Sequence, residues 1–181
     1  MVQAPLHSTA MADVAVIVLT YNEETNIAQA LDSLAGWARE IFILDSFSTD
    51  RTLDIARAYG CHVIQHKFDN YARQRNYALD ALPIHSEWVL FLDADEWLPD
   101  ALKQEITTTL AGGPSADGFY LNRRLIWMGR WIRRGYYPSW ILRLLPERRA
   151  ACGTKSRAAS RRTPGPRICG CSMPRSRASA P

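Results

Sequence analysis

Short, continuously apolar runs alternate with amphipathic segments along most of this chain, and the alternation limits the folds open to it. The runs at 14–19, 41–44 and 89–92 have the length and composition of strands buried on both faces, and 61–65, which includes His62 and Gln65, is expected as the third strand in chain order. The segments between them place their apolar residues on one face of a helix. We therefore expect an α/β fold with a mostly parallel sheet and right-handed crossovers.

Polar residues and prolines mark where the helices begin. We expect Asn22 to cap the first helix and Asp50 to cap the second, because short polar side chains accept hydrogen bonds from free N–H groups. A third helix is expected from about Asn70 to Leu82, and Pro99 should begin a fourth. A strand from Gly118 to about Ile126 should follow.

Closely spaced carboxylates follow the fourth apolar run, and they carry the clearest functional signal. Asp93 and Asp95 stand where the strand ends, which is where open α/β sheets bind ligands. Two carboxylates so close repel each other, and a hard divalent cation such as Mg²⁺ or Mn²⁺ would relieve the repulsion while binding substrate phosphates. The alternative is that Asp95 only caps the helix near Pro99.

Polar loops also follow the first and second apolar runs. They hold residues 20–23 and 45–50, and in a parallel sheet they lie at the same edge as Asp93. The chain contains neither the G-x-G-x-x-G fingerprint of dinucleotide-binding proteins nor a P-loop. Phosphate would therefore be held through a metal ion.

The net charge of +4 over 181 residues is unevenly distributed. Residues 151–181 hold seven lysines and arginines and no acid, so the first 150 residues carry the difference, −3. A mildly acidic globular part argues against a nucleic-acid partner. The tail at 147–181 cannot bury enough apolar area to offset its ordering entropy, and we expect it to be disordered.

Cysteines and targeting signals are uninformative beyond a few exclusions. No two of the four cysteines have C-x-x-C spacing, and no disulfide framework is indicated, which fits a reducing cytoplasm. We expect residues 1–12 to be a flexible leader without the features of a signal peptide. No stretch has the ~20 apolar residues of a membrane-spanning helix.

Four motifs in the expected order together resemble the family-2 glycosyltransferases of the GT-A fold, a Rossmann-like three-layer α/β/α architecture. They are residues 16–24 (VIVLTYNEE), 44–50 (LDSFSTD), 74–76 (QRN) and 93–96 (DADE). The second and fourth motifs look like the branch that includes lipopolysaccharide-core β-glucosyltransferases. The resemblance covers about residues 13–146, which we expect to form one nucleotide-sugar-binding domain.

The resemblance implies roles for the residues in these motifs. Thr20, Tyr21 and Glu23 would lie against the base and ribose of a nucleotide-diphospho-sugar, most simply a UDP-sugar. Asp45 would accept a hydrogen bond from the base.

The same resemblance assigns the diphosphate end of the pocket. Arg73 or Arg75 would approach the base or the diphosphate, and Asp93 would meet the ribose or a metal-bound water. Asp95, with Asp93, would hold Mg²⁺ or Mn²⁺, which neutralises the departing nucleotide diphosphate.

The resemblance also implies an inverting transfer in cell-envelope glycan synthesis, with a carboxylate base that activates the acceptor. That base lies downstream in relatives, whereas Glu147 is the last acid here, and Glu96 is the one conceivable substitute. The composition changes after residue 146, as a frameshift or truncation would produce. We therefore expect donor binding with impaired catalysis. A non-catalytic nucleotide-binding fragment and a metal-dependent nucleotidyltransferase remain as alternatives.

Arginines and aromatic residues interleave over 123–146, a second unusual region. This composition suits a saccharide or lipid-linked acceptor, or peripheral contact with the inner face of the plasma membrane. Ordinary packing and single-stranded nucleic acid are the other interpretations.

Overall fold

The computed structural model describes residues 11–114, 116–135, 137–147 and 167–174, the last as backbone only. The elements in chain order are β1 (Ala12–Thr20), α1 (Ile27–Leu34), β2 (Ala38–Asp45), α2 (Thr52–Ala58), β3 (His62–Gln65), α3 (Tyr71–Ala81), β4 (Trp88–Asp93), α4 (Asp100–Ala111), β5 (Phe119–Trp127), β6 (Arg130–Ile132), β7 (Ser139–Pro146) and β8 (Arg167–Pro174).

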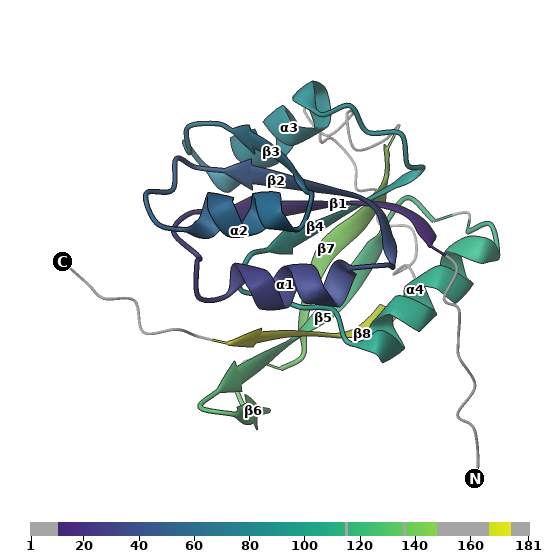
Figure 1. The fold of residues 1–181 in the computed structure, drawn as a ribbon. Coiled ribbons are helices and arrows are strands. Elements are labelled where there is room, and N and C mark those ends of the chain that lie inside the picture. The colour runs from purple at the N-terminus through teal and green to yellow at the C-terminus, as the bar shows by residue number, and fades with distance from the viewer. Residues whose placement is uncertain (1–10, 115, 136, 148–166, 175–181) are drawn as a thin grey trace, which may run out of the picture.

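One sheet contains all the described strands, in the order β3-β2-β1-β4-β7-β5-β6, with β8 paired to β5 (Figure 1). β1 pairs in parallel with β2 and β4, and β2 pairs in parallel with β3. β7 is antiparallel to both β4 and β5. Of the described strands, only β6 and β7 run against the common direction, so the α/β fold with a mostly parallel sheet is confirmed.

Helices cover both faces of the sheet. Successive residues of β1 point to opposite faces, so this strand contributes side chains to the core on each side. Val14, Val16 and Val18 pack in one cluster with residues of α1, α2 and α4. Ala15 and Ile17 pack in a second cluster with residues of α3. Burial on both faces is the reason that β1 is almost continuously apolar, and it gives the three-layer arrangement expected from the sequence.

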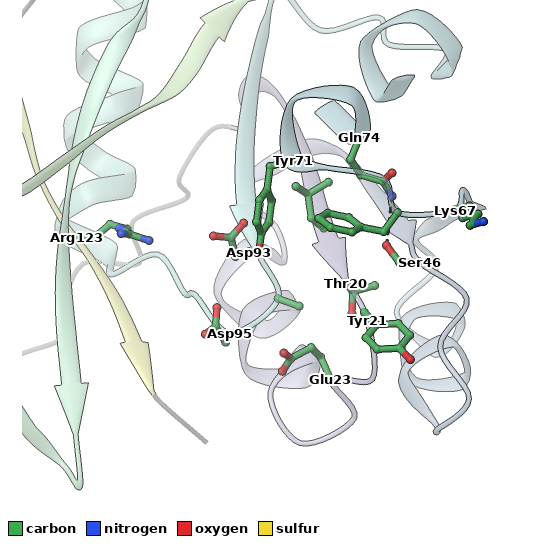
Figure 2. Close-up of a pocket in the computed structure, with 13 residues that line it drawn as sticks. Thr20, Tyr21, Glu23, Ser46, Lys67, Tyr71, Gln74, Asp93, Asp95 and Arg123 are labelled. Atoms are coloured by element: carbon green, nitrogen blue, oxygen red, sulfur yellow. Dashed lines mark hydrogen bonds between the residues drawn. The ribbon is translucent and has the colours of Figure 1, made fainter. Parts of the chain in front are cut away.

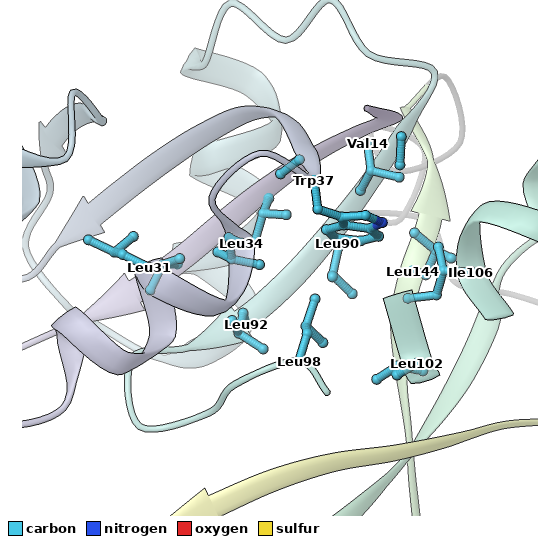
Figure 3. Close-up of a cluster of buried hydrophobic side chains, with 14 of the residues drawn as sticks. Val14, Leu31, Leu34, Trp37, Leu90, Leu92, Leu98, Leu102, Ile106 and Leu144 are labelled. Carbon is cyan, nitrogen blue, oxygen red and sulfur yellow. The ribbon is translucent and has the colours of Figure 1, made fainter. Parts of the chain in front are cut away.

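The larger cluster joins α1 and α4 across the centre of the sheet (Figure 3). Leu31 and Leu34 of α1, Leu90 of β4 and Ile106 of α4 are fully buried in it. Trp37, in the turn after α1, is buried there too, and its indole N–H donates to Thr107 Oγ1 of α4 at 3.1 Å. The face of the sheet that α1 and α4 cover therefore has one continuous apolar core.

The helix starts differ in detail from those expected. Asn22 does not cap α1, which begins at Ile27, and it adopts a left-handed conformation with φ of 52°. Asp50 does accept a hydrogen bond from the N–H of Thr52, the first residue of α2, at 3.0 Å. Pro99 is the residue before α4, and no side chain caps that helix, so the alternative of Asp95 as its cap is wrong.

The structure also differs from the sequence-based expectation in the C-terminal tail. Residues Arg167–Pro174, within the tail expected to be disordered, form β8 in parallel with β5. β6 and β7 occupy one edge of β5, so its other edge carries N–H and C=O groups that need partners, and backbone pairing does not require apolar side chains. The rest of the tail, and residues 1–10 of the expected leader, lie outside the described residues.

Gly118 allows the chain to enter β5 directly against β7. Its φ is +153°, and an added Cβ would lie 2.7 Å from Leu145 Cδ2 and 3.1 Å from the Leu144 carbonyl oxygen. We expect Gly118→Ala to lower the free energy of unfolding by about 1–3 kcal/mol, through overpacking and backbone strain. Urea denaturation followed by circular dichroism measures this.

Gly112→Ala is the matched control. Gly112 ends α4 with an ordinary φ of −74°, and a Cβ there meets nothing closer than 3.4 Å. We expect a change within about 0.5 kcal/mol. Equal effects of the two substitutions would contradict the tight approach at Gly118.

Candidate functional site

The register of the parallel strands brings three polar loops to one edge of the sheet. Leu19 lies opposite Asp93 of β4, and Thr20 lies opposite Asp45 of β2. Since parallel strands share a carboxyl edge, the loops after β1, β2 and β4 meet there. Their convergence, predicted from the sequence, is confirmed.

A cavity of about 750 Å³ opens at this edge. That volume is in the range of small-ligand sites. Figure 2 shows Asp93, Asp95 and Glu23 grouped near Arg123, with Lys67 at the opposite side of the cavity. The lining residues are Leu19, Thr20, Tyr21, Glu23, Ser46, Lys67, Phe68, Tyr71, Gln74, Asp93, Ala94, Asp95 and Arg123.

Crossed hydrogen bonds fix the loop after β1 to the loop after β2. The N–H of Asn22 donates to Ser48 Oγ at 2.8 Å, and Asn22 Oδ1 accepts from the N–H of Thr49 at 2.8 Å. The N–H of Glu24 donates to Asp50 Oδ2 at 3.1 Å. The left-handed conformation of Asn22 is thus held by contacts across the edge, and these contacts position the Tyr21–Glu23 side of the cavity.

Asp45 has a different role from the one expected. It is fully buried below the cavity and does not line it. Its carboxylate accepts hydrogen bonds from the N–H and the hydroxyl of Ser48, and from Gln65 Nε2 at 2.9 Å. Because protein donors already occupy this carboxylate, Asp45 shapes the loop, and direct contact with a base does not fit its placement.

Asp95 lies in the cavity among other carboxylates. Burial, and then the negative charges of Asp93 and Glu23, raise the pKa of Asp95 to about 6. A hard cation would remove this repulsion, and Mg²⁺ typically binds through one or two carboxylates together with substrate phosphates and water. Among the described residues, no group of three or more histidine, cysteine or acidic side chains forms a complete metal site. The donor set fits a cation shared with a ligand.

Asp93 is held by a buried arginine from β7. Arg143 is 3% exposed, and its Nη1 and Nη2 donate to the two Asp93 oxygens at 3.2 and 2.6 Å. Burial raises the pKa of Asp93, but the hydrogen bonds and charge of Arg143 outweigh it and hold the pKa below its usual value. Asp93 is therefore a charged residue whose position the protein itself fixes.

Glu96 belongs to the same buried cluster. Its Oε1 accepts from Arg143 Nη2 at 3.0 Å, and its Oε2 accepts from the N–H of Asp93 at 3.1 Å. The side chain is 1% exposed and does not line the cavity. Burial raises its pKa despite Arg143. The expectation of Glu96 as a substitute base is not supported by this placement, because it cannot reach an acceptor without leaving the core.

The two arginines expected from α3 take separate places, and neither lines the cavity. Arg73 is exposed and pairs with Asp69 at 3.0 Å. Arg75 is half-buried, with its guanidinium 5.6 Å from the centre of the Phe91 ring. Burial and the charge of Arg143 lower the pKa of Arg75, whereas Asp93 and Glu96 raise it, so only Arg75 remains electrostatically linked to the site.

Sequence reasoning missed several residues of the cavity. Phe68 and Tyr71 are exposed at its rim and meet edge to face, with 5.1 Å between ring centres. With Tyr21 they offer apolar surfaces on which a planar ring can stack. Lys67 and Arg123 add positive charge on opposite sides. Lys67, Phe68 and Tyr71 follow β3, and their position after that strand was the sequence signal for them, whereas Arg123 was noted only as part of the arginine-aromatic region 123–146.

Thr20 and Gln74 line the buried floor of the cavity. Gln74 Nε2 donates to the Ser46 hydroxyl at 3.3 Å and to the His66 carbonyl at 3.2 Å. The Thr20 hydroxyl is buried and has no hydrogen-bond partner among the described residues. A polar group left in this state favours a ligand that supplies a partner after a small adjustment.

Fold and site together define an α/β protein with a cavity of small-ligand size at the carboxyl edge of parallel strands. The class can be narrowed by comparison. Residues 15–180 match the family described as Glycosyl transferase family 2, and the chain belongs to that family. The match extends beyond residue 146 and includes β8. None of the helices in the described part of the chain is long and apolar enough to cross a membrane.

Curated relatives include glycosyltransferases of bacteria. An uncharacterized glycosyltransferase of Rickettsia typhi is 35% identical over 96 residues, which are 53% of this chain and 32% of the relative. The lipopolysaccharide core biosynthesis glycosyltransferase LpsC of Rhizobium meliloti is 30% identical over 126 residues, 67% of this chain and 44% of LpsC. The chain thus spans less than half the length of either relative.

Solved structures share the fold. TarS 1–349 of S. aureus in complex with UDP-GlcNAc has a TM-score of 0.54 and 25% identity, covering 70% of this chain and 38% of that one. Glucosyl-3-phosphoglycerate synthase from Mycobacterium tuberculosis, in complex with Mn²⁺ and UDP-glucose, has a TM-score of 0.52 and 23% identity, covering 61% and 43%.

The buried cluster of Arg143, Asp93 and Glu96 can be tested through stability. We expect Arg143→Met to lower the free energy of unfolding by about 3 kcal/mol, because it removes the cation that hydrogen-bonds both the buried Glu96 and the partly buried Asp93. Adding Glu96→Gln should recover part of the loss. Chemical denaturation of the single and double variants measures both effects.

Arg39→Met is the control, since Arg39 forms an exposed ion pair with Asp13 at 2.9 Å. We expect it to change stability by less than about 1 kcal/mol. A small effect at Arg143, similar to that at Arg39, would show that the buried cluster does not hold the site together.

Proposed function

We propose that the cavity binds a nucleotide-diphospho-sugar, with a UDP-sugar as the first candidate, as the donor of a glycosyl transfer. The observation that carries the proposal is the convergence of Asp93, Asp95 and Glu23 with the aromatic rim of Tyr21, Phe68 and Tyr71 in one cavity. Membership of glycosyl transferase family 2 supports it, as does the likeness to TarS in complex with UDP-GlcNAc.

The two ends of the cavity suit the two ends of such a donor. A pyrimidine base stacks on the aromatic rim, while the diphosphate lies near Asp95 and Arg123. A divalent cation, Mn²⁺ or Mg²⁺, would be held by Asp95 on the cavity side, with Asp93 oriented by Arg143 beside it. When bound, the cation neutralises the charge of the departing nucleotide diphosphate.

We infer that transfer to the acceptor requires a base that the described residues do not supply. In the described part of the chain, the acids that line the cavity are Glu23, Asp93 and Asp95. We assign all three to the donor, and Glu96 is enclosed by Arg143. An inverting transfer to a saccharide or lipid-linked acceptor in envelope glycan synthesis is the activity proposed for the whole protein, supported by the relative LpsC.

Nucleotide binding without turnover is the second candidate function of this chain. The enclosure of Glu96 favours it over efficient transfer. The family match favours both candidates over the nucleotidyltransferase considered from the sequence.

Calorimetric titration of residues 1–181 with UDP-glucose and UDP-GlcNAc, with and without Mn²⁺, tests donor binding. We expect Mn²⁺ to strengthen binding. In the presence of Mn²⁺, Asp95→Asn should weaken binding about tenfold, or by roughly 1.4 kcal/mol, because a ligand of the cation is lost. A nucleotide diphosphate release assay on the same samples reports turnover.

Asp80→Asn is the matched control, because Asp80 is exposed on α3 and does not line the cavity. It should bind as the parent chain does. If the parent chain binds neither UDP-sugar with Mn²⁺ present, or if the two variants lose affinity equally, the proposed site is wrong.

A further inference from the structure

The aromatic and basic residues of 123–146 divide into a packed part and an exposed part. Trp131 is packed: the guanidinium carbons of Arg124 and Arg133 lie 4.7 and 4.5 Å from its ring centres, and Tyr137 meets it edge to face at 5.0 Å. The ring of Trp131, which lies opposite Ile126 in the β5–β6 hairpin, is therefore in contact with neighbouring side chains. They do not include the hairpin tip.

The tip of the hairpin exposes two large apolar side chains. Trp127, which ends β5, is 43% exposed, and Met128, the first turn residue, is 87% exposed. β5 and β6 project from the body of the sheet, with β6 at the end of the strand order (Figure 1). Trp127 and Met128 are therefore exposed to water at the turn of the hairpin.

Met128 is also the wrong residue for its turn. Met128 and Gly129 have φ of 47° and 73°, the two positive values that favour asparagine and glycine in a two-residue hairpin turn. A methionine there carries backbone strain as well as exposed apolar surface. Two costs fall on one residue that leaves 87% of its surface exposed, and together they point to a contact outside the described fold.

The charge around the tip indicates what that contact is. Residues 118–146 hold six arginines and no acid, and Arg130, Arg133 and Arg134 are exposed at the hairpin. Apolar and aromatic side chains at a tip, with Arg130 beside them and Arg133 and Arg134 farther along the same hairpin, match the boundary between headgroups and acyl chains of an anionic bilayer. A saccharide would need polar side chains at the tip itself, and Trp127 and Met128 offer almost none.

We propose that the β5–β6 hairpin tip docks this protein on an anionic lipid surface. Trp127 and Met128 enter the interface, and the exposed arginines face the headgroup phosphates. Arg123 lines the donor cavity on β5, about 17 Å along the strand direction from the turn residue Met128 at a rise of about 3.3 Å per residue. Docking therefore holds the cavity near the membrane, where a lipid-linked acceptor is presented; this last step rests on the proposed function.

Vesicle flotation of residues 1–181 tests the docking. Vesicles of phosphatidylcholine with 30% phosphatidylglycerol are compared with pure phosphatidylcholine at about 0.15 M salt. We expect binding to the anionic vesicles only, and an affinity at least about tenfold lower for the Arg133→Gln/Arg134→Gln variant.

Met128→Asn is the sharper variant, because asparagine suits the turn. It should raise or maintain the unfolding midpoint while weakening vesicle binding severalfold. Controls are Met11→Asn, which removes another exposed methionine, and Arg39→Gln/Arg57→Gln, which removes two exposed charges on β2 and α2. Both controls should float as the parent chain does.

Three outcomes overturn the docking proposal: no binding to anionic vesicles, equal losses in the hairpin variants and the controls, or binding of a single-stranded oligonucleotide at the hairpin in place of vesicles. UDP-sugar titrations of the same proteins keep this result separate from the donor site. Titrations that succeed while flotation fails overturn the docking alone.

Discussion

Parallel pairing of β1 with both β2 and β4 is the interaction on which the geometry of the site depends. Its register sets Leu19 beside Asp93 and Thr20 beside Asp45, so loops far apart in sequence end at one edge. Alternation along a strand is strict, and a slip by one residue would turn Asp93 from the site to the opposite face. Both faces of β1 are buried, which leaves no such freedom.

Charge is balanced in two different ways within a few residues. Arg143 neutralises Asp93 and Glu96 inside the protein, so these carboxylates stay in place without a ligand. Asp95 has no comparable partner among the described residues, and burial with the charges of Asp93 and Glu23 raises its pKa. The contrast separates a carboxylate that organises the edge from one that is left for a ligand, although the sequence presents Asp93 and Asp95 as an equivalent pair.

The strands, the helices and the meeting edge were predictable because burial on both faces leaves a strong compositional signal. The roles of single polar residues were not. Asn22 and Asp45 have side chains short enough to cap a helix, contact a ligand or bind a neighbouring loop, and only the fold decides among these partners. Arg143 was one arginine among many, and its carboxylates lie about fifty residues earlier in the chain. β8 was not predicted, because the apolar content of residues 167–174 gives no information about the free edge of β5 with which they pair.

The origin of Arg143 in β7 has a consequence for the order of assembly during synthesis. Every strand of the parallel half, β1 to β4, leaves the ribosome before residue 143 does, and that half has its own apolar core. Asp93 and Glu96 lack Arg143, which hydrogen-bonds both of them, throughout that interval. Burying them is unfavourable until β7 arrives, so the nascent sheet can collapse early while its functional edge remains open and hydrated. The edge closes only when the antiparallel strand β7 adds to β4, so β7 is the element whose arrival completes the charged cluster beside the cavity.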